Sequence, residues 1–186
     1  VFNPNASGSV YSILAYNGSL YVGGDFVTIG GQAMNKIAKL DPVTGVVDLA
    51  FDPNASSRVQ TIATDGTHLF IGGYFTTIDG TTRNRIAKVD IATGALDATF
   101  NPNANQLVDA LIYHNGSIYV GGSFTTISGV SRNYLAKLDA TTGVADPSFI
   151  PNPSSTIYSL FYYNDALYVG GYFTTISGQS FNNLAK

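Results

Sequence analysis

The stretch YVGGDFVTIGG occupies residues 21–31, and close copies of it return along the chain. FIGGYFTTIDG begins at Phe70, YVGGSFTTISG at Tyr119 and YVGGYFTTISG at Tyr168. Each copy starts 49 residues after the one before it, with no insertion or deletion between them. A period this constant indicates a tandem array of structural units.

The period divides the chain into three full units and a shorter fourth, covering residues 2–50, 51–99, 100–148 and 149–186. Each unit opens with F-x-P-N and continues with an apolar run, a hairpin signal and a second strand that ends in Gly-Gly. A loop of nine or ten residues then leads to a third strand, a T-G turn and a short fourth strand. The hairpin signals are Asn17-Gly18, Asp65-Gly66, Asn115-Gly116 and Asn164-Asp165, which are candidates for type I′ turns.

Four antiparallel strands in 49 residues are typical of one propeller blade. We therefore predict an all-β chain that forms a single β-propeller region over residues 1–186, with four blades of which the last is incomplete. A β-trefoil has repeats of similar length but needs three units, and is the weaker alternative. The composition agrees, because Glu is absent while Gly, Thr, Val, Ile, Tyr and Phe are abundant.

The repeated unit resembles the delta-60 repeat, a kelch-like repeat of large exported bacterial proteins. The resemblance rests on the successive motifs VGGxFTTI-x-G, N-x-[IL]-A-K-[LV]-D, TG, D and F-x-P. It is also similar to the kelch-like repeats of a fungal surface protein that marks bud sites. The resemblance spans all 186 residues and implies a propeller in a secreted or cell-surface protein, often multidomain. It implies no catalytic residues. The hairpins differ from those of the family. Family members often have an Asp-Gly hairpin, whereas in this chain Asn-Gly occurs at least as often as Asp-Gly.

Charge and hydropathy argue against two classes of partner. The net charge is −3 and no basic block is present, so the phosphate-neutralising side chains of a nucleic-acid-binding protein are missing. No apolar run approaches the roughly 20 residues of a membrane span, so we expect no membrane insertion. Cysteine is absent, which excludes disulfides and thiolate metal sites.

The chain carries no recognisable catalytic signature. His68 and His114 both fall near hairpins on the side of the tight turns, whereas a nucleophile–His–acid triad would need them on the side of the longer loops, and no local triad signature is present. Asp pairs such as Asp41 and Asp48 flank each T-G turn, where Asp commonly caps turns, and their spacing matches no calcium loop. We predict no catalytic, cofactor or metal site, and keep an enzyme with a site at the central channel as the weakest alternative.

Strand directions place all tight turns on one face of the propeller, and the two longer loops of each unit on the other, here called the long-loop face. Comparison of the units shows that the variable positions gather in these loops, whereas the Gly pair and F-x-T-I never change. We expect the Phe of F-x-T-I to pack between blades, and the invariant Asn of the Asn-x-x-Ala-Lys run to bond to loop backbone. Variation on one face of a fixed frame is typical of loop-borne recognition. The candidate partner-binding residues are Asp25, Met34, Arg58, Tyr74, Arg83, Arg132, Tyr172 and Phe181.

We expect this face to bind a protein or a glycan in a non-enzymatic binding or adhesion module. The alternative is a structural or assembly element of a surface protein or filament. The fourth unit stops inside its third strand, at Lys186, and would leave an unpaired edge. We therefore expect further blades, in a larger propeller or multidomain protein, or a second copy of the chain to close the ring.

Overall fold

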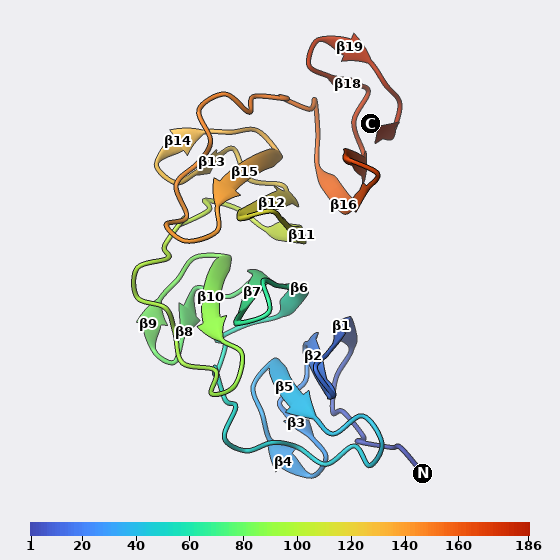
Figure 1. The fold of residues 1–186 in the computed structure, drawn as a ribbon, viewed down its shortest axis with the longest axis vertical. Coiled ribbons are helices and arrows are strands. Elements are labelled where there is room, and N and C mark those ends of the chain that lie inside the picture. Colours follow the sequence, from blue (N-terminus) through green and yellow to red (C-terminus); the bar gives the residue numbers. More distant parts are fainter.

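The computed structural model describes residues 1–186, and every regular element in it is a β-strand. The four units follow one another along an open arc, and each unit contains a three-stranded sheet and a two-stranded hairpin (Figure 1). The first strand of each unit lies on the concave side of the arc (Figure 1). The predicted all-β propeller architecture is confirmed.

Each unit forms a three-stranded antiparallel sheet whose middle strand is the second in sequence. The innermost strands are β1 (Val10–Tyr16), β6 (Val59–Thr64), β11 (Val108–His114) and β16 (Ile157–Tyr163). The middle strands are β2 (Ser19–Gly24), β7 (His68–Gly73), β12 (Ser117–Gly122) and β17 (Ala166–Gly171). The outer strands are β5 (Ile37–Leu40), β10 (Ile86–Asp90), β15 (Leu135–Asp139) and β20 (Leu184–Ala185).

The loop after each Gly pair contains a small hairpin that the sequence pattern did not reveal. Its strands are β3 (Thr28–Ile29) and β4 (Gln32–Ala33), β8 (Thr77–Ile78) and β9 (Thr81–Thr82), β13 (Thr126–Ile127) and β14 (Val130–Ser131), and β18 (Thr175–Ile176) and β19 (Gln179–Ser180). The hairpin tip bonds to the F-x-P-N segment of its own unit, as when Asp79 N donates to Pro53 O at 3.0 Å. The hairpin therefore ties the end of each unit's loop back to the start of that unit.

The predicted fourth strand is shorter than expected. It is reduced to isolated bridges, which join Leu40 to Val47, Val89 to Leu96 and Leu138 to Ala145. In the first unit the ladder continues by one bond, from Asp48 N to Lys39 O, before the Asp48 carboxylate accepts the N–H of Ala50. That side-chain bond turns the chain toward the next unit and ends the strand.

The tight hairpins are type I′ in three of the four units, as predicted, because both central residues have positive φ. These pairs are Asn17-Gly18, Asn115-Gly116 and Asn164-Asp165. The second unit differs, since Gly66 alone has positive φ. There the Asp65 carboxylate accepts the backbone N–H groups of Thr67 and His68, and this side-chain turn replaces the backbone turn.

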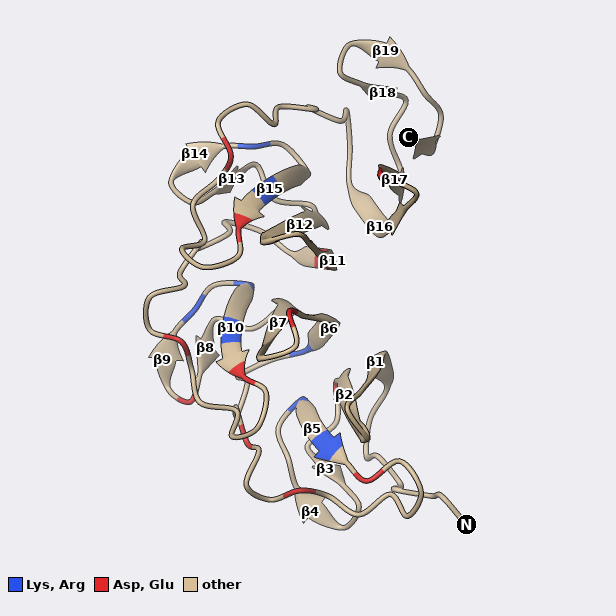
Figure 2. Cartoon of the chain, viewed as in Figure 1, with Lys and Arg blue, Asp and Glu red and all other residues tan.

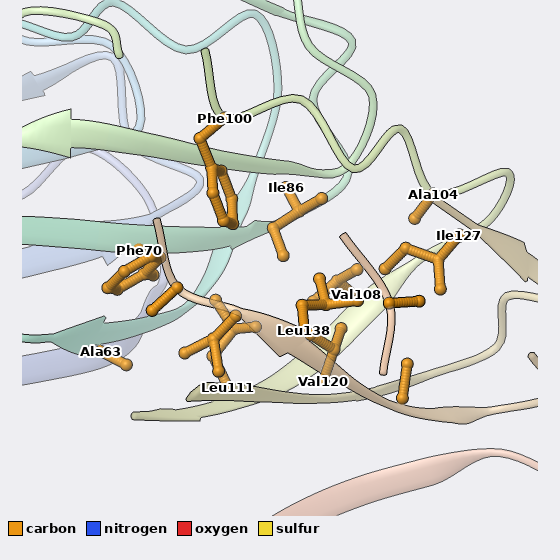
Figure 3. Close-up of a cluster of buried hydrophobic side chains, with 14 of the residues drawn as sticks. Ala63, Phe70, Ile86, Phe100, Ala104, Val108, Leu111, Val120, Ile127 and Leu138 are labelled. Atoms are coloured by element: carbon orange, nitrogen blue, oxygen red, sulfur yellow. The ribbon is translucent and has the colours of Figure 1, made fainter. Parts of the chain in front are cut away.

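Three of the four hydrophobic clusters lie between adjacent units, and the fourth lies within the first unit. One cluster joins Phe70 and Ile86 of the second unit to Val108, Leu111 and neighbours in the third (Figure 3). Two other clusters join the first unit to the second and the third to the fourth. As expected, the Phe of F-x-T-I is fully buried in every unit, at Phe26, Phe75, Phe124 and Phe173.

The Gly-Gly pair is invariant because two different neighbours approach it. A Cβ on Gly23 would lie 2.7 Å from Val59 Cγ1 of the next unit, so the first glycine lets adjacent units meet. A Cβ on Gly73 would fall against the carbonyl oxygen of Arg58, which accepts the N–H of Tyr74 at 2.9 Å. The second glycine thus lets the middle strand pass close to its own innermost strand.

At one equivalent position in every unit, directly after the invariant Asn, a residue with a long side chain or an amide adopts the left-handed conformation although it is not glycine. These residues are Lys36, Arg85, Tyr134 and Asn183, with φ between 63° and 67°. Lys36 donates its N–H to Phe26 O at 3.0 Å, and its carbonyl accepts the N–H of Gly24 at 2.8 Å. The bend therefore closes the loop that displays the residue between the Gly pair and Phe.

The invariant Asn before this bend has a different partner from the predicted one. We expected it to bond to loop backbone, but Asn35 Nδ2 donates to the side chain of Asn54 at 2.8 Å. Asn84 and Asn103 repeat this bond at 2.7 Å. Each bond joins two adjacent units, and Asn54 and Asn103 have positive φ, which Asn tolerates better than most residues.

Candidate functional site

The two longer loops of each unit contact each other through a short polar side chain. Ser56 Oγ accepts the N–H groups of Thr76 and Thr77, at 3.1 and 3.0 Å. The first, third and fourth units repeat this arrangement through Ser7, Asn105 and Ser154. The first position of the variable loop, occupied by Ser7, Ser56, Asn105 and Ser154, is therefore structural.

Three of the predicted candidates come together where the first and second units meet. Arg58 donates through Nε and Nη2 to Asp25 Oδ2, at 3.2 and 2.9 Å. The guanidinium carbon lies 4.3 Å from the ring centroid of Tyr11 and 4.8 Å from that of Tyr74. We call these four residues the Arg58 cluster.

A β-bulge positions Tyr11. The pairing between the innermost and middle strands shifts at Tyr11, and the other three units have the same shift at Gln60, Asp109 and Tyr158. A bulge re-aims the side chain that it carries. Asp25 and Tyr74 each follow a Gly pair, and their N–H groups donate to Ser9 O and Arg58 O. The cluster thus lies at the inner rim of the long-loop face.

The charges of the cluster support one another. Hydrogen bonds from Arg58 hold the pKa of the Asp25 carboxyl below its usual value, and the bond to Asp25 raises the pKa of Arg58. Lys36 adds a second cation, whose Nζ lies 3.7 Å from Asp25 Oδ1. Asp25 and Arg58 keep 39% and 28% of their side-chain surface exposed, so a partner can reach them.

The guanidinium retains donors for a ligand. Both bonds to Asp25 end on one carboxylate oxygen, and Nη1 has no partner within the chain. The Tyr rings and Asp25 fix the plane of the guanidinium, so these donors have a set direction before any ligand arrives. Such an arrangement can bind hydroxyl or carboxylate oxygens beside an aromatic surface.

Two predicted partner contacts are corrected, because the residues are buried. Met34 lies in the core of the first unit, with 2% of its surface exposed. Arg83 is 6% exposed and donates through Nη2 to the carbonyl oxygens of Asp97 and Ala98. Its role is to hold the chain that leaves the second unit, and a partner cannot contact it without displacing these bonds.

The other three candidates lie apart from the cluster. Arg132 is half-buried and repeats the bond of Arg83, since Nη2 donates to Asp146 O at 3.0 Å. Tyr172 is exposed at the far end of the arc, and Phe181 lies beside an apolar cleft in the fourth unit. The structure therefore brings Asp25, Arg58 and Tyr74 together and separates the rest.

Sequence reasoning missed two members of this site. Tyr11 is one of twelve tyrosines in the chain and is absent from the predicted candidates. Its position reads Tyr, Gln, Asp and Tyr in the four units, and this variation was a usable signal. The sequence does not indicate that Lys36 lies near Asp25, because its position depends on the left-handed bend.

The remaining polar residues form no second site of this kind. Asp65 and His68 bond to each other at the hairpin, and His114 stacks on Tyr162 with the ring centroids 3.7 Å apart. Each T-G turn is capped by an Asp, as when Asp90 Oδ1 accepts from Ala92, Thr93 N and Thr93 Oγ1. No group of three His, Cys, Asp or Glu side chains is arranged to hold a metal ion. No helix is long and apolar enough to cross a membrane.

The third strands carry a regular set of ion pairs. Figure 2 shows one basic position on each of β5, β10 and β15, followed by acidic residues in the turn beyond. The pairs are Lys39 with Asp48, Lys88 with Asp97 and Lys137 with Asp146, at 2.8, 3.2 and 3.0 Å. Because these ion pairs recur at the same position in three units, they are structural parts of the repeat.

An apolar cleft of about 470 Å³ lies in the fourth unit, lined by Phe149, Leu167, Val169, Phe181 and neighbours. The equivalent space in the first and third units is filled by Val47 and Ala145. The sequence has no equivalent residue in the fourth unit.

Comparison with known proteins agrees with this architecture. The chain is similar to the computationally designed Ika4 protein, with 15% identity and a TM-score of 0.59 over 88% of this chain and 86% of that one. It is also similar to the designed Ika8 protein, with 16% identity and a TM-score of 0.60. That match covers 93% of this chain but only 46% of Ika8, so the chain spans about half of the longer protein. At these identities the likeness shows the fold alone.

No curated protein matches the chain. A family profile matches three successive segments, residues 17–51, 68–100 and 115–149, which together make up more than half of the chain. Each segment runs from the first hairpin of a unit, or the strand just after it, to the Phe that opens the next unit, so the profile follows the same period as the structure. The chain therefore belongs to the β-propeller family described as a domain of unknown function (DUF5122).

Proposed function

We propose that the chain is a non-enzymatic binding module of a secreted or cell-surface protein, and that its partner docks on the inner rim of the long-loop face. The observation that carries this proposal is the Arg58 cluster. Three residues in two units fix a partly exposed guanidinium, and the equivalents of Arg58 in the other units are Ser9, Leu107 and Thr156. The frame does not need this arginine, since three of four units do without it.

The chemistry of the cluster favours a glycan as the partner. Sugar rings present an apolar face to aromatic side chains and hydroxyl groups to charged ones, and the cluster has both kinds of group side by side. Tyr11 is 41% exposed, while Asp25 offers an acceptor and Arg58 offers donors. A protein loop that presents a carboxylate next to an aromatic side chain is the alternative partner.

The test is a glycan array probed with the 186-residue chain and with Arg58→Ala. We expect binding to a limited group of glycans, and a loss of at least about tenfold in affinity for Arg58→Ala, because a charge-assisted bond and the ring stacking disappear together. Arg58→Lys should recover little, since an ammonium group cannot bond to Asp25 and lie flat between two rings at once.

Leu107→Ala is the matched control, because Leu107 occupies the equivalent position in the third unit. It should bind as the unchanged chain does. If no glycan binds, but a surface protein captured by the chain is lost with Arg58→Ala, the partner is a protein. Binding that is equally strong in Arg58→Ala and Tyr74→Ala would place the partner elsewhere and refute this site.

A specific observation also favours the second candidate role, an assembly element. Both ends of the arc expose apolar residues whose counterparts are buried between the internal units. Binding and assembly use different side chains, because the Arg58 cluster lies between the first two units, although its Tyr11 is next to the exposed Val10 in β1.

A further inference from the structure

The contact between adjacent units is repeated three times, and each half of it is defined by particular residues. The first glycine of one unit receives an apolar residue from the innermost strand of the next, as Gly23 receives Val59. A Cβ at Gly72 or Gly121 would likewise meet Val108 or Ile157, at 2.5 and 2.7 Å. These three apolar residues are fully buried.

The two ends of the arc carry the unmatched halves of the same contact. At the start, Val10 is 39% exposed and Ile13 is 64% exposed, whereas their counterparts Val59 and Ile62 are buried. At the other end, a Cβ on Gly170 would meet only its own Ser159, and no residue of another unit. Leu184 is 66% exposed there, although its counterpart Ile37 is fully buried.

We propose that two copies of this chain associate head to tail, with Val10 and Ile13 of one copy packing on Gly170 and Leu184 of the other. The partner is a second copy because the open end of the fourth unit has the shape that the first unit's innermost strand fits, and the internal junctions show that fit three times. Two such junctions close the arc of Figure 1 into a ring of eight units.

Polar and aromatic groups set the register of the junction. Ser12 Oγ accepts the N–H of Ile62 at 3.1 Å, and Thr61 Oγ1 accepts that of Leu111 at the same distance. Ser159 holds the matching hydroxyl at the open end, where it accepts the N–H of Ile13 from the second copy. This bond fixes which residue of the incoming strand lies over Gly170.

An aromatic pair adds a second register mark. Tyr21 packs edge-on against Phe51 of the next unit, with ring centroids 5.5 Å apart, and Tyr119 packs in the same way on Phe149 at 5.7 Å. Tyr168 occupies the equivalent position in the last unit, and Phe2, exposed in the single chain, is its counterpart. The two therefore meet across the junction, as such pairs do within the chain.

The absence of cysteine allows a direct test by engineered disulfide. A Cβ on Gly23 would lie 3.3 Å from Val59 Cβ, close to the separation that a disulfide needs. Gly23→Cys with Val59→Cys is therefore the positive control and should cross-link within one chain. A mixture of Val10→Cys chains and Gly170→Cys chains should form a covalent dimer, while either variant alone should not.

Mass in solution gives an independent measurement. Light scattering coupled to size exclusion should give twice the 19.6 kDa of one chain, and Ile13→Asp should weaken the association by at least about tenfold. Ile13 is exposed in the single chain, so this variant should fold, which far-UV circular dichroism checks. Val43→Asp is the matched control, because Val43 is 79% exposed in the first unit's T-G turn and lies outside the junction.

The alternatives give different results. A chain that stays monomeric at every soluble concentration and fails to cross-link in the mixture overturns the proposal. Cross-linking of Val10→Cys alone, without the second variant, indicates head-to-head association and overturns it as well. Glycan binding by a monomeric chain would leave the proposed function in place and refute this junction only.

Discussion

The Lys88–Asp97 ion pair shows how the contribution of an ion pair to stability depends on how deeply the pair is buried. The Lys88 side chain is only 6% exposed, and Asp97 is its carboxylate partner, whereas Lys39 and Asp48 keep 18% and 38% of their side chains exposed. Removing one partner of a buried pair leaves an uncompensated charge, whereas exposed pairs contribute little. The same ion pair therefore matters more in the second unit than in the first.

This difference predicts the effect of two matched substitutions. Asp97→Ala should lower the free energy of unfolding by about 3 kcal/mol, because it strands the Lys88 ammonium and removes a turn cap. Asp48→Ala should lower it by about 1 kcal/mol. Urea denaturation followed by circular dichroism measures both, and equal losses would contradict the role assigned to burial.

The Asp97 carboxyl also predicts a dependence on pH. Burial alone would raise its pKa, but hydrogen bonds from Thr99 and Lys88 outweigh burial and lower the pKa from 3.8 to about 2. Since the folded-state pKa is the lower one, the stabilisation is complete above the unfolded value and is lost as the pH falls from about 4 to 2.

For Asp97 this loss amounts to at most ~2 kcal/mol. Unfolding midpoints in urea at pH 7, 4 and 2.5 measure it. Asp97→Asn should lose less stability between pH 4 and 2.5 than the unchanged chain. If the two lose the same amount, other carboxyls are responsible.

Two glycine substitutions distinguish effects on folding stability from effects on dimer formation. Gly72→Ala should lower the unfolding free energy by about 1–3 kcal/mol, because its Cβ would lie 2.5 Å from Val108 Cγ1. Gly170→Ala has room in the single chain, so it should leave the stability of the monomer unchanged while weakening the dimer. Thermal melts and light scattering on both variants distinguish these effects, and a monomer destabilised equally by both would contradict them.

At the scale of the elements, the small hairpins depend on the side chains that cap them. Ser56 Oγ accepts two backbone N–H groups at the start of the β8–β9 hairpin, and Asn105 Oδ1 does the same for β13–β14. An unpaired backbone donor costs about 1–2 kcal/mol when it is shielded from water. Substitution of the capping residue should therefore change the stability of its hairpin.

Ser56→Ala should lower the unfolding free energy by about 1 kcal/mol, and Ser56→Asn should retain most of it, because Asn already occupies this position in the third unit. Differential scanning calorimetry of the three chains tests the comparison. A Ser56→Asn chain as unstable as Ser56→Ala would show that the two caps are not interchangeable.

The elements also show how far sequence reasoning reaches. The 49-residue period predicted the blades, the long-loop face and the buried Phe of F-x-T-I, because repetition reports what every unit needs. It predicted Asp25, Arg58 and Tyr74 as candidates, but it could not predict that they meet, since Asp25 and Arg58 lie in different units. Met34 and Arg83 were misassigned because variation between units also occurs in the interior, where each junction packs slightly differently.

On the scale of the whole molecule, the arc behaves as a linear array in which each unit contacts only its neighbours. Stability in such arrays is approximately the sum of unit and junction contributions, so the ends are weakest. The innermost strands β6 and β11 are covered on both sides by other units, and β1 and β16 on one side only.

Hydrogen exchange should therefore be slowest in β6 and β11 and faster in β1 and β16 at low protein concentration. Raising the concentration should protect β1 and β16 selectively, because the head-to-tail junction covers them. Mass-spectrometric exchange at two concentrations measures this change. Uniform protection along the chain, independent of concentration, would argue against both the linear array and the junction.

The left-handed residue of each unit has a wider consequence. Lys36, Arg85, Tyr134 and Asn183 each adopt a backbone conformation that costs a non-glycine residue roughly 1 kcal/mol, yet no unit uses glycine there. The backbone at this position therefore adopts a strained conformation with four different side chains. An amine, a guanidinium, a phenol and an amide occupy equivalent positions in the four units. Lys36 and Arg85 bond to the carbonyl oxygens of Asp25 and Tyr74, the two displayed residues of the Arg58 cluster. Exchanging these four side chains among the units would change the chemistry of the rim without redesigning a single strand.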